Sequence, residues 1–170
     1  MTDPLPLLCC VDVDYRGDHA VAAALLFLDW SAKDPVAQHV VTVQGVAPYR
    51  PGSFYERELP CIEAVLARNH WPLAAIVVDG FVWLGEAEPG LGARLFTALG
   101  EQVPVIGVAK NPYRGAPAVA VRRGDSNKPL YVTAAGMTAD AAAACVLRMH
   151  GVHRLPTLLK EVDRLCREGG

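Results

Sequence analysis

A short apolar run, Leu73-Ala-Ala-Ile-Val-Val78, constrains the fold more than any other stretch of the chain. Turn signals bound it on both sides, and its length and composition predict a strand that is buried on both faces. A buried central strand of this kind is typical of an α/β protein. Asp79 and Gly80 stand at its carboxyl end, where such sheets gather their ligands.

Three further strands are predicted before this run. Pro6 to Asp14 forms a short buried strand, and the turn Arg16-Gly17-Asp18 follows it. His19 to Trp30 fits a helix by its alanines or a strand by its place after a hairpin-like turn, and we favour the strand. Val36 to Val46 alternates in part and is rich in β-branched residues, which predicts a third strand. The three would form an antiparallel meander.

Helices and strands then alternate. A helix is predicted from about Tyr55 to Asn69, a loop over Phe81 to Pro89, a helix over Gly90 to Leu99 and a buried strand over Val103 to Val108. The predicted fold class is therefore α/β, with a mixed central sheet of three antiparallel strands and then parallel strands, flanked by helices. This layout resembles that of the ribonuclease H-like nucleases.

The last third of the chain completes one predicted domain, residues 1–170. Ala118 to Arg123 and Leu130 to Thr133 form a predicted hairpin with a polar tip. Thr138 is a candidate N-cap for an alanine-rich helix, Ala139 to Met149, and a last helix spans about Thr157 to Arg167. The 170 residues, 52% of them hydrophobic, suffice for one substantial core.

Net charge, the N-terminal sequence and the cysteines limit which partners and which cell compartment are expected. A formal net charge of −2 provides no broad basic field for tight binding to nucleic acid, although a local basic patch remains compatible with it. The N-terminus lacks the basic region of a signal peptide, and no stretch has the length and apolarity of a membrane span. Five cysteines without a CxxC pair indicate buried free thiols in a reducing cytoplasm: Cys9, Cys10, Cys61, Cys145 and Cys166. We expect a cytoplasmic protein with no membrane partner.

The stretch from Pro48 to Pro60 joins the third strand to the first helix and carries a notable side chain near each end. Tyr49 lies between two prolines that restrict φ, and Gly52 allows a tight bend, so the ring is expected on a stiff loop. Glu58 lies in the first turns of the helix. The plain alternatives are a packing tyrosine and a surface glutamate favoured by the helix dipole.

Asp12, Glu58 and Asp79 each stand at the edge of an apolar element, where desolvating an unpaired carboxylate is costly. In the predicted layout the strands that carry Asp12 and Asp79 are neighbours, and like charges so close repel unless a cation lies between them. Hard oxygen ligands suit Mg²⁺ or Mn²⁺, which can support cleavage of a phosphodiester. The sequence predicts a divalent-metal site there.

Basic residues could complete such a site. Lys110, at the end of the next strand, is expected beside the carboxylates, where it could neutralise a phosphate; the alternative is an ordinary loop lysine. A track for a nucleic-acid backbone, or simply scattered surface cations, could be formed by Arg50, Arg57, Arg114, Arg122, Arg123 and Lys128.

Together these residues resemble the endonuclease V family, nucleases that cut near deaminated bases, chiefly inosine. The matching pieces occur in the family's order over nearly the whole chain: Val11-Asp-Val13 with Tyr15, Pro48-Tyr-Arg-Pro-Gly52 with Arg57-Glu58 and Pro60, Val78-Asp-Gly80, Ile106-Gly-Val-Ala-Lys110 and Arg154-Leu-Pro156. The chain looks like a short variant, with almost nothing before its first strand.

The resemblance implies a ribonuclease H-like fold, a Mg²⁺ cofactor with Mn²⁺ as an alternative, and a partner that is DNA or RNA containing deaminated bases. It implies that Asp12, Glu58 and Asp79 bind metal and act in catalysis together with Lys110. Tyr49 would be a wedge that enters the duplex where the damaged base leaves the stack. The loop around the wedge would be shaped by Pro48, Arg50, Pro51 and Gly52, and Gly80 would line the base pocket. We expect a monomer.

Two departures from the family pattern leave an alternative open. Similar proteins carry a Gly-His pair where this chain has Ala134-Ala135, and Asp140 is a nearby candidate substitute. The loop after Gly80 lacks the His-Pro character of the family's base pocket. The alternative is a protein of the same fold that binds nucleic-acid structure with an altered substrate or little cleavage.

Overall fold

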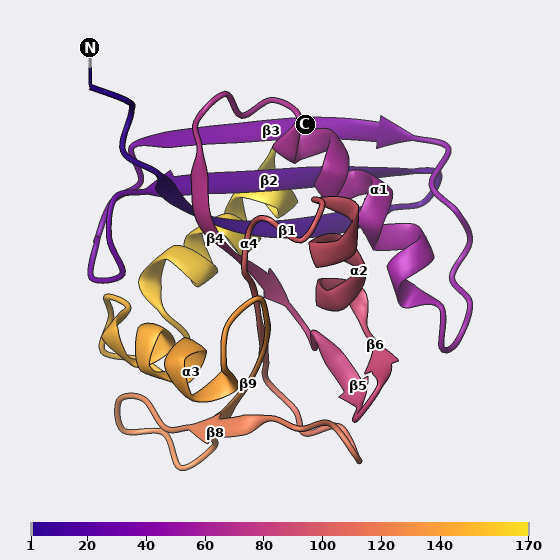
Figure 1. Cartoon of the computed structure of the whole chain (residues 1–170). Coiled ribbons are helices and arrows are strands. Elements are labelled where there is room, and N and C mark those ends of the chain that lie inside the picture. Colours follow the sequence, from indigo (N-terminus) through magenta and orange to yellow (C-terminus); the bar gives the residue numbers. More distant parts are fainter. Residues whose placement is uncertain (1, 170) are drawn as a thin grey trace.

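Seven strands form one mixed sheet in the computed structural model, which describes residues 2–169 (Figure 1). The strands lie in the order β3, β2, β1, β4, β7, β9, β8 across the sheet. Their bounds are Leu7–Arg16 for β1, His19–Phe27 for β2, Ala37–Gln44 for β3, Leu73–Asp79 for β4, Val105–Ala109 for β7, Val119–Val121 for β8 and Leu130–Ala135 for β9. The predicted fold class is confirmed.

The first three strands form the predicted antiparallel meander. β2 pairs with β1 from Phe27 opposite Leu8 to His19 opposite Arg16, and β3 lies along the other side of β2. The stretch from Ala20 to Phe27 is wholly buried, because both faces of β2 are covered by helices. A strand buried on both faces needs apolar residues throughout, which explains why the alanine-rich sequence of β2 also fits a helix. The prediction of a strand is confirmed.

The remaining strands extend the sheet from β1. β4 runs parallel to β1, and β7 runs parallel to β4. The predicted hairpin of β8 and β9 is also present, and β9 joins the sheet antiparallel to β7. β4 therefore lies near the middle of the sheet, as its continuous apolar sequence predicts.

Four helices cover the two faces of the sheet. Figure 1 shows α1 (Phe54–Leu66) and α2 (Leu91–Ala98) on one side and α4 (Thr157–Glu168) on the other, and α3 (Ala139–Arg148) shares a core with α4. One core lies between the sheet and α1 and α2, and the second between the sheet and α3 and α4. The Thr138 hydroxyl caps α3 by accepting from the Ala141 backbone N–H at 3.1 Å, as predicted.

Two local predictions were wrong. The segment Phe81 to Pro89 is not wholly loop, because β5 (Trp83–Gly85) and β6 (Glu88–Pro89) form a small hairpin beside α2. Helix α1 ends at Leu66 and not near Asn69. The Asn69 side chain there accepts from the Trp71 N–H at 3.0 Å and donates to the Trp71 carbonyl at 2.7 Å, which fixes a turn.

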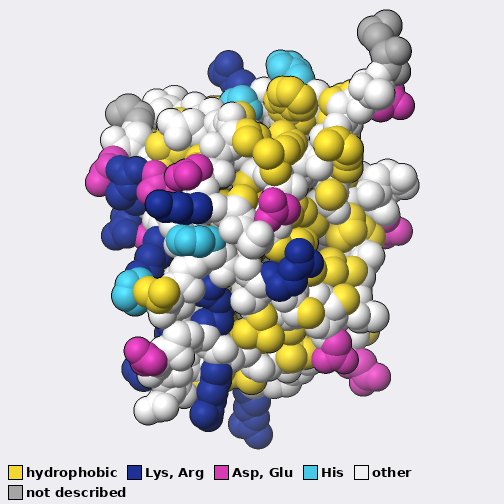
Figure 2. Space-filling view, turned by 90° about the vertical axis from the view of Figure 1, so that its left-hand side faces the viewer, with side chains coloured by type: hydrophobic (Ala, Val, Ile, Leu, Met, Phe, Trp, Pro, Cys, Tyr) yellow, Lys and Arg dark blue, Asp and Glu magenta, His cyan; other side chains and the backbone are white. Residues whose placement is uncertain are grey.

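The edge of the sheet where β1 and β4 begin carries exposed apolar side chains. Leu5 and Trp71 precede these two strands, and Leu28 and Val36 lie between β2 and β3. Figure 2 shows the side of the molecule that lies on the left in Figure 1, with hydrophobic side chains gathered mainly in its upper and right-hand parts. Within residues 2–169, no helix is long and apolar enough to span a bilayer.

Candidate active site

Three neighbouring parallel strands place three predicted residues on one face of the sheet. Along β1, Leu8 and Cys10 contribute to the core beneath α3 and α4, and Asp12 continues that alternation. Along β4 the same series is Ala75, Val77 and Asp79, and along β7 it is Ile106 and Val108 followed by Lys110.

The strand register brings these residues together. Cys10 is paired with Val77, so Asp12, within β1, and Asp79, the last residue of β4, stand level on adjacent strands, each two residues further on. Asp79 is paired with Val108, two residues before Lys110. All three side chains line one small cavity of about 30 Å³. The predicted neighbourhood of Asp12, Asp79 and Lys110 is confirmed as geometry, and their roles stay predictions.

Helix α4 closes this cavity with a carboxylate that the sequence did not single out. Asp163 lines the cavity. A carboxylate oxygen of Asp12, one of Asp163 and the sulfur of Cys166 all lie within 4.8 Å of one another. Asp163 also forms an ion pair with Arg167 on the same helix. The sequence did contain a signal for Asp163. It lies four residues after Leu159 and three before Cys166, a helical spacing that puts it on the stripe of α4 that faces the sheet.

Glu58 is buried, with only 4% of its surface exposed, although it is the fifth residue of an amphipathic helix. Its Oε2 is buried without a hydrogen-bond partner in the described part of the chain. Burial raises the pKa of this carboxyl to about 9, and the charges of Asp12 and Asp79 add to the rise. The surface-glutamate interpretation is therefore excluded, and Glu58 is electrostatically coupled to the other two carboxylates.

The pKa of Asp12 is raised to about 7, first by burial and then by the charge of Asp79. A hydrogen bond from the Val13 N–H at 2.9 Å stabilises the Asp12 carboxylate and opposes this rise. Asp79 lies at the exposed rim, yet the atoms crowded around its carboxyl raise its pKa, while the Lys110 ammonium lowers it. Full ionisation of these carboxyls is thus unfavourable in the metal-free fold, and a bound cation would favour their charged forms.

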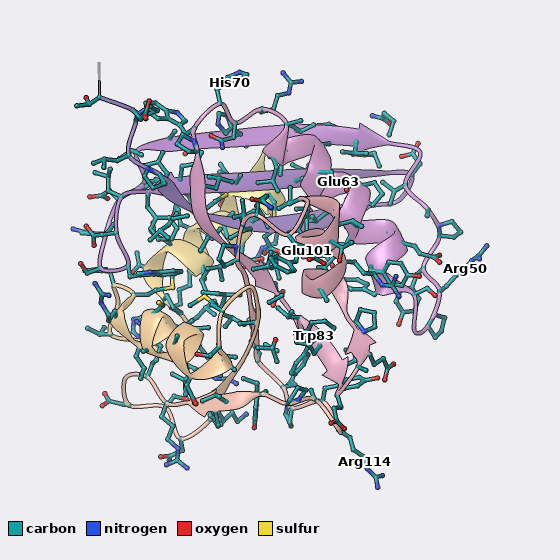
Figure 3. The ribbon with its side chains drawn as sticks, viewed as in Figure 1. Arg50, Glu63, His70, Trp83, Glu101 and Arg114 are labelled. Atoms are coloured by element: carbon teal, nitrogen blue, oxygen red, sulfur yellow. The ribbon has the colours of Figure 1, made fainter. Side chains whose placement is uncertain are left out.

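The loop before α1 carries the residues predicted to contact nucleic acid. Tyr49 is 61% exposed, and the neighbouring Pro48, Arg50, Pro51 and Gly52 are exposed as well. Gly52 has φ of +80°, which permits the bend that leads into α1. Figure 3 shows Arg50 projecting outward from this loop.

A second cavity, of about 270 Å³, lies between this loop and the loop after β4. Gly52 and Gly80 both line it, and Asp79 lines both this cavity and the carboxylate cavity. The rest of its wall is largely apolar and aromatic, formed by Phe54, Tyr55, Phe81, Leu84, Gly90, Leu91 and Tyr113. Its volume and aromatic lining are compatible with a planar ring.

The wall formed by the loop after β4 is fixed by close packing against β7 and β9. A Cβ at Gly107 would lie 2.5 Å from the Gly80 carbonyl oxygen and 2.8 Å from Thr133 Oγ1. The Val82 N–H donates to that same Thr133 hydroxyl at 2.8 Å, and the Trp83 indole N–H donates to the Ala134 carbonyl at 2.9 Å. A glycine at position 107 is therefore needed for the wall to approach the sheet this closely.

The predicted basic track is only partly available. Arg50 and Arg114 both project outward in Figure 3. Arg57 instead lies over the ring of Tyr15, 3.8 Å from its centroid. Arg123 is buried, with 6% of its surface exposed, and donates to backbone carbonyls, so its prediction as a surface cation was wrong. The remaining two, Arg122 and Lys128, are exposed.

Next to Ala134-Ala135, where the sequence suggested Asp140 as a substitute for a family histidine, α3 places no carboxylate at the cavity. Ala135 is buried at the end of β9, and Asp140 is exposed in the first turn of α3, outside the set of residues that line the carboxylate cavity. Asp163 of α4 is the additional carboxylate that reaches this cavity.

Comparisons of the sequence with known proteins and of the fold with solved structures point to one family. The family model described as Endonuclease V matches residues 2–118. Endonuclease V of Streptomyces avermitilis is 32% identical over 182 residues, an alignment that covers 92% of this chain and 77% of that protein.

Solved structures give the same result. The crystal structure of the endonuclease V from Streptomyces avermitilis superposes with a TM-score of 0.79 at 28% identity, covering 97% of this chain and 83% of that one. A variant of Ciona intestinalis endonuclease V, in complex with a 23mer DNA that contains an inosine followed by a ribo-adenosine, has a TM-score of 0.78. It is 16% identical, with coverage of 95% and 84%, and shows likeness of fold.

Proposed function

The chain belongs to the endonuclease V family, and from this premise we propose that it is a metal-dependent endonuclease that hydrolyses a phosphodiester bond near deaminated purines, chiefly inosine, in DNA or RNA. The observation that carries the proposal is the arrangement of Asp12, Asp79 and Lys110 around one cavity, from the middle of β1, the end of β4 and the residue after β7. Carboxylates beside a lysine in such a cavity suit the cleavage of a phosphodiester by a metal-dependent hydrolase.

Asp12, Glu58 and Asp79 are the proposed ligands of Mg²⁺, with Mn²⁺ as an alternative, and Asp163 is a further candidate. The residues fit a hard divalent cation, because Asp12, Asp79 and Asp163 line one cavity, and the Glu58 carboxyl, which the charges of Asp12 and Asp79 affect, has a buried oxygen without a partner among the described residues. When bound, such an ion supplies Lewis-acid stabilisation of a phosphate and lowers the pKa of a coordinated water.

Lys110 has a separate proposed role. Its ammonium is exposed at the cavity and is close enough to Asp79 to lower the pKa of that carboxyl. In that position it can pair with a phosphate oxygen and neutralise charge that develops during cleavage. A positive side chain among carboxylates also offsets the repulsion that the acidic cluster would exert on a phosphate.

The substrate base is proposed to occupy the 270 Å³ cavity beside Asp79, with Gly80 in its wall. Tyr49 would fill the gap in the base stack, and its exposure on a loop stiffened by Pro48 and Pro51 supports this role. Arg50 projects from the same loop and can contact the nucleic-acid backbone, while Gly52 shapes the cavity rim. Extraction of a base costs a few kcal/mol and is cheapest at a mispaired position, which favours a deaminated base.

The alternative is a nucleic-acid binder of the same fold with an altered substrate or little cleavage. Its support is Ala134-Ala135 in place of the family's Gly-His pair. The two functions share the cavities and differ in whether bound substrate is cut.

The deciding experiment is cleavage of labelled single-inosine DNA and RNA oligonucleotides in Mg²⁺, Mn²⁺ or EDTA. Wild type is compared with Asp79→Asn, which removes a carboxylate charge from the cavity, and with Asp125→Asn, which makes the same change in the exposed hairpin tip. We expect metal-dependent product near inosine from wild type and Asp125→Asn. The Asp79→Asn rate should fall at least about a hundredfold without loss of fold.

Other outcomes decide against the proposal. Full activity of Asp79→Asn would reject the carboxylate site. Tight binding of the oligonucleotides by wild type without product in any metal would favour the alternative.

A further inference from the structure

The segment between α3 and α4 is held by one buried arginine. Arg123, on the turn after β8, donates to the carbonyl oxygens of Met149 at 2.5 Å and His153 at 2.8 Å. It also donates to those of Gly151 at 3.3 Å and Arg154 at 3.2 Å. Four carbonyl groups of residues 149–154 therefore converge on one guanidinium group. This segment has a fixed backbone although it belongs to no helix or strand.

Arg154 extends from the fixed segment to the loop that follows β7. Its Nη2 donates to the carbonyl oxygen of Lys110 and to that of Pro129, the second at 2.7 Å. Its Nε is buried and has no hydrogen-bond partner among the described residues. The guanidinium of Arg154 is thus directed into the protein, and both Nη2 protons are used by carbonyl groups.

The contact with Lys110 matters because the loop 110–117 has few other hydrogen bonds, although its Tyr113 ring packs against that of Phe81 with the centroids 5.8 Å apart. Its two other backbone hydrogen bonds, from Ala116 to Tyr113 and from Ala118 to Ala116, lie within the loop or at its end. Lys110 is its first residue, and β7 ends at Ala109. The Arg154 bond therefore fixes the backbone from which the lysine side chain reaches the carboxylate cavity.

We propose that Arg154 is a positioning residue, which holds the Lys110 backbone so that the lysine ammonium stays at the cavity lined by Asp12, Asp79 and Asp163. The inference rests on the proposed nuclease function and deepens it. Arg154 comes three residues before α4, so one guanidinium group connects the loop of Lys110 to the helix that carries Asp163. The same guanidinium group donates to the carbonyl of Pro129, which directly precedes β9, so it also connects the loop and the helix to that strand.

A positioning role and a direct contact with the substrate predict different kinetics. If Arg154 acts through Lys110, its loss lowers the single-turnover rate constant at saturating enzyme and leaves substrate affinity almost unchanged. A phosphate contact would instead weaken binding. A displacement of about 1 Å in a reacting group can cost on the order of a hundredfold, so we expect a decrease of about tenfold to a hundredfold in the rate constant of Arg154→Ala.

The test is a double-mutant cycle on single-turnover cleavage of the inosine oligonucleotide. The variants are Arg154→Ala, Lys110→Ala and the pair, with Arg148→Ala on α3 as a control that removes an exposed arginine. In the Lys110→Ala background, Arg154→Ala should reduce the rate less than about threefold, because the group that it positions is gone. Arg154→Lys, which keeps one donor group, should recover part of the rate. Additive losses, or a loss confined to substrate binding, would overturn the proposal.

Amide hydrogen exchange gives a readout that does not depend on activity. Exchange in a peptide covering residues 110–117 should become faster in Arg154→Ala and stay at the wild-type rate in Arg148→Ala, while the peptides of β1 and β4 keep their protection. Unchanged exchange in 110–117 would overturn the proposal even if cleavage is slower. If wild type cuts no inosine substrate, the proposed function fails, and the exchange experiment still decides whether Arg154 anchors the loop.

Discussion

Asp12, from the first strand, and Asp163, from the last helix, bring their carboxylate oxygens within 4.8 Å of each other, with the Cys166 sulfur beside them. Asp163 contributes to the raised pKa of Asp12, behind burial and the charge of Asp79. Its charge is partly balanced by Arg167 on the same helix. The acidic centre therefore draws on both ends of the chain.

Replacement of Asp163 by Asn tests whether it is part of the metal site. Because the charge of Asp163 faces Asp12, we expect Asp163→Asn to raise the Mg²⁺ concentration for half-maximal cleavage about tenfold or more. Glu161→Gln is the matched control, since Glu161 also pairs with an arginine on α4 but lies outside this cavity. A metal titration of cleavage rates measures both variants, and equal Mg²⁺ dependence of the two would exclude Asp163 from the site.

The metal-free protein should lose stability as pH rises. Burial raises the pKa of Asp12 to about 7 and that of Glu58 to about 9, well above the ordinary values of these carboxyls in an unfolded chain. Between these limits the folded state holds protons that the unfolded chain has released, so the free energy of unfolding falls with increasing pH.

Denaturant unfolding in EDTA between about pH 5 and pH 8 checks this, and we expect a loss of about 1 kcal/mol or more. Glu58→Gln should flatten the dependence, because its amide cannot ionise, and Mg²⁺ should restore the stability of wild type at high pH. A pH-independent unfolding free energy for metal-free wild type would contradict the burial of these charges.

Tyr49 should affect duplex substrates more than single strands. Because it is 61% exposed, Tyr49→Ala should leave the melting temperature unchanged. Loss of an aromatic ring that stacks on a base costs about 1–3 kcal/mol, so cleavage of inosine in a duplex should slow about tenfold. An unpaired base in a single strand needs no wedge and should be cut at nearly the wild-type rate.

Parallel rate measurements on the two substrates provide the readout for Tyr49→Ala. Trp71→Ala is the control, since Trp71 is half exposed and lies before β4, at the other end of the strand from Asp79. An equal effect of Tyr49→Ala on duplex and single strand would reject the wedge.

Gly107→Ala should disturb the wall of the base cavity. The added methyl group would lie 2.5 Å from the Gly80 oxygen, so the loop must move, and we expect a loss of about 1–3 kcal/mol in stability. Cleavage should fall as well, because Gly80 and Phe81 line the cavity. Thermal unfolding and cleavage are compared with Gly85→Ala, whose nearest neighbour is the flexible Glu88 side chain at 3.4 Å. A fully stable and active Gly107→Ala would show that the close approach is not required.

The positions of Asp12, Asp79 and Lys110 could be predicted because each belongs to or directly follows a strand: Asp12 lies within β1, Asp79 ends β4 and Lys110 follows β7. A continuous apolar run identifies a buried strand, and parallel neighbours bring their carboxyl ends to one edge. The observed register, with Cys10 opposite Val77, then places the two aspartates level. Local sequence was sufficient for this part of the site.

Asp163 and Arg123 could not be found in the same way. The spacing along α4 places Asp163 on the stripe that faces the sheet, but which part of the sheet this stripe covers depends on how the helix docks. Arg123 is buried because four backbone carbonyls converge on it, and a carbonyl carries no sequence signal. Glu58 is an intermediate case. The helix that carries it was predicted, but how deeply the Glu58 side chain is buried depends on the packing of α1 against the sheet.

The docking of α4 against β1 and β2 also bears on how the protein is made. During synthesis the strands from β1 to β9 emerge before Thr157–Glu168, so a nascent chain can form its sheet while Asp12 still lacks Asp163 and the lid of its cavity. Such an intermediate leaves the apolar residues beneath α4 open to water until the helix arrives. The acidic centre can therefore be completed only after Thr157–Glu168 has left the ribosome.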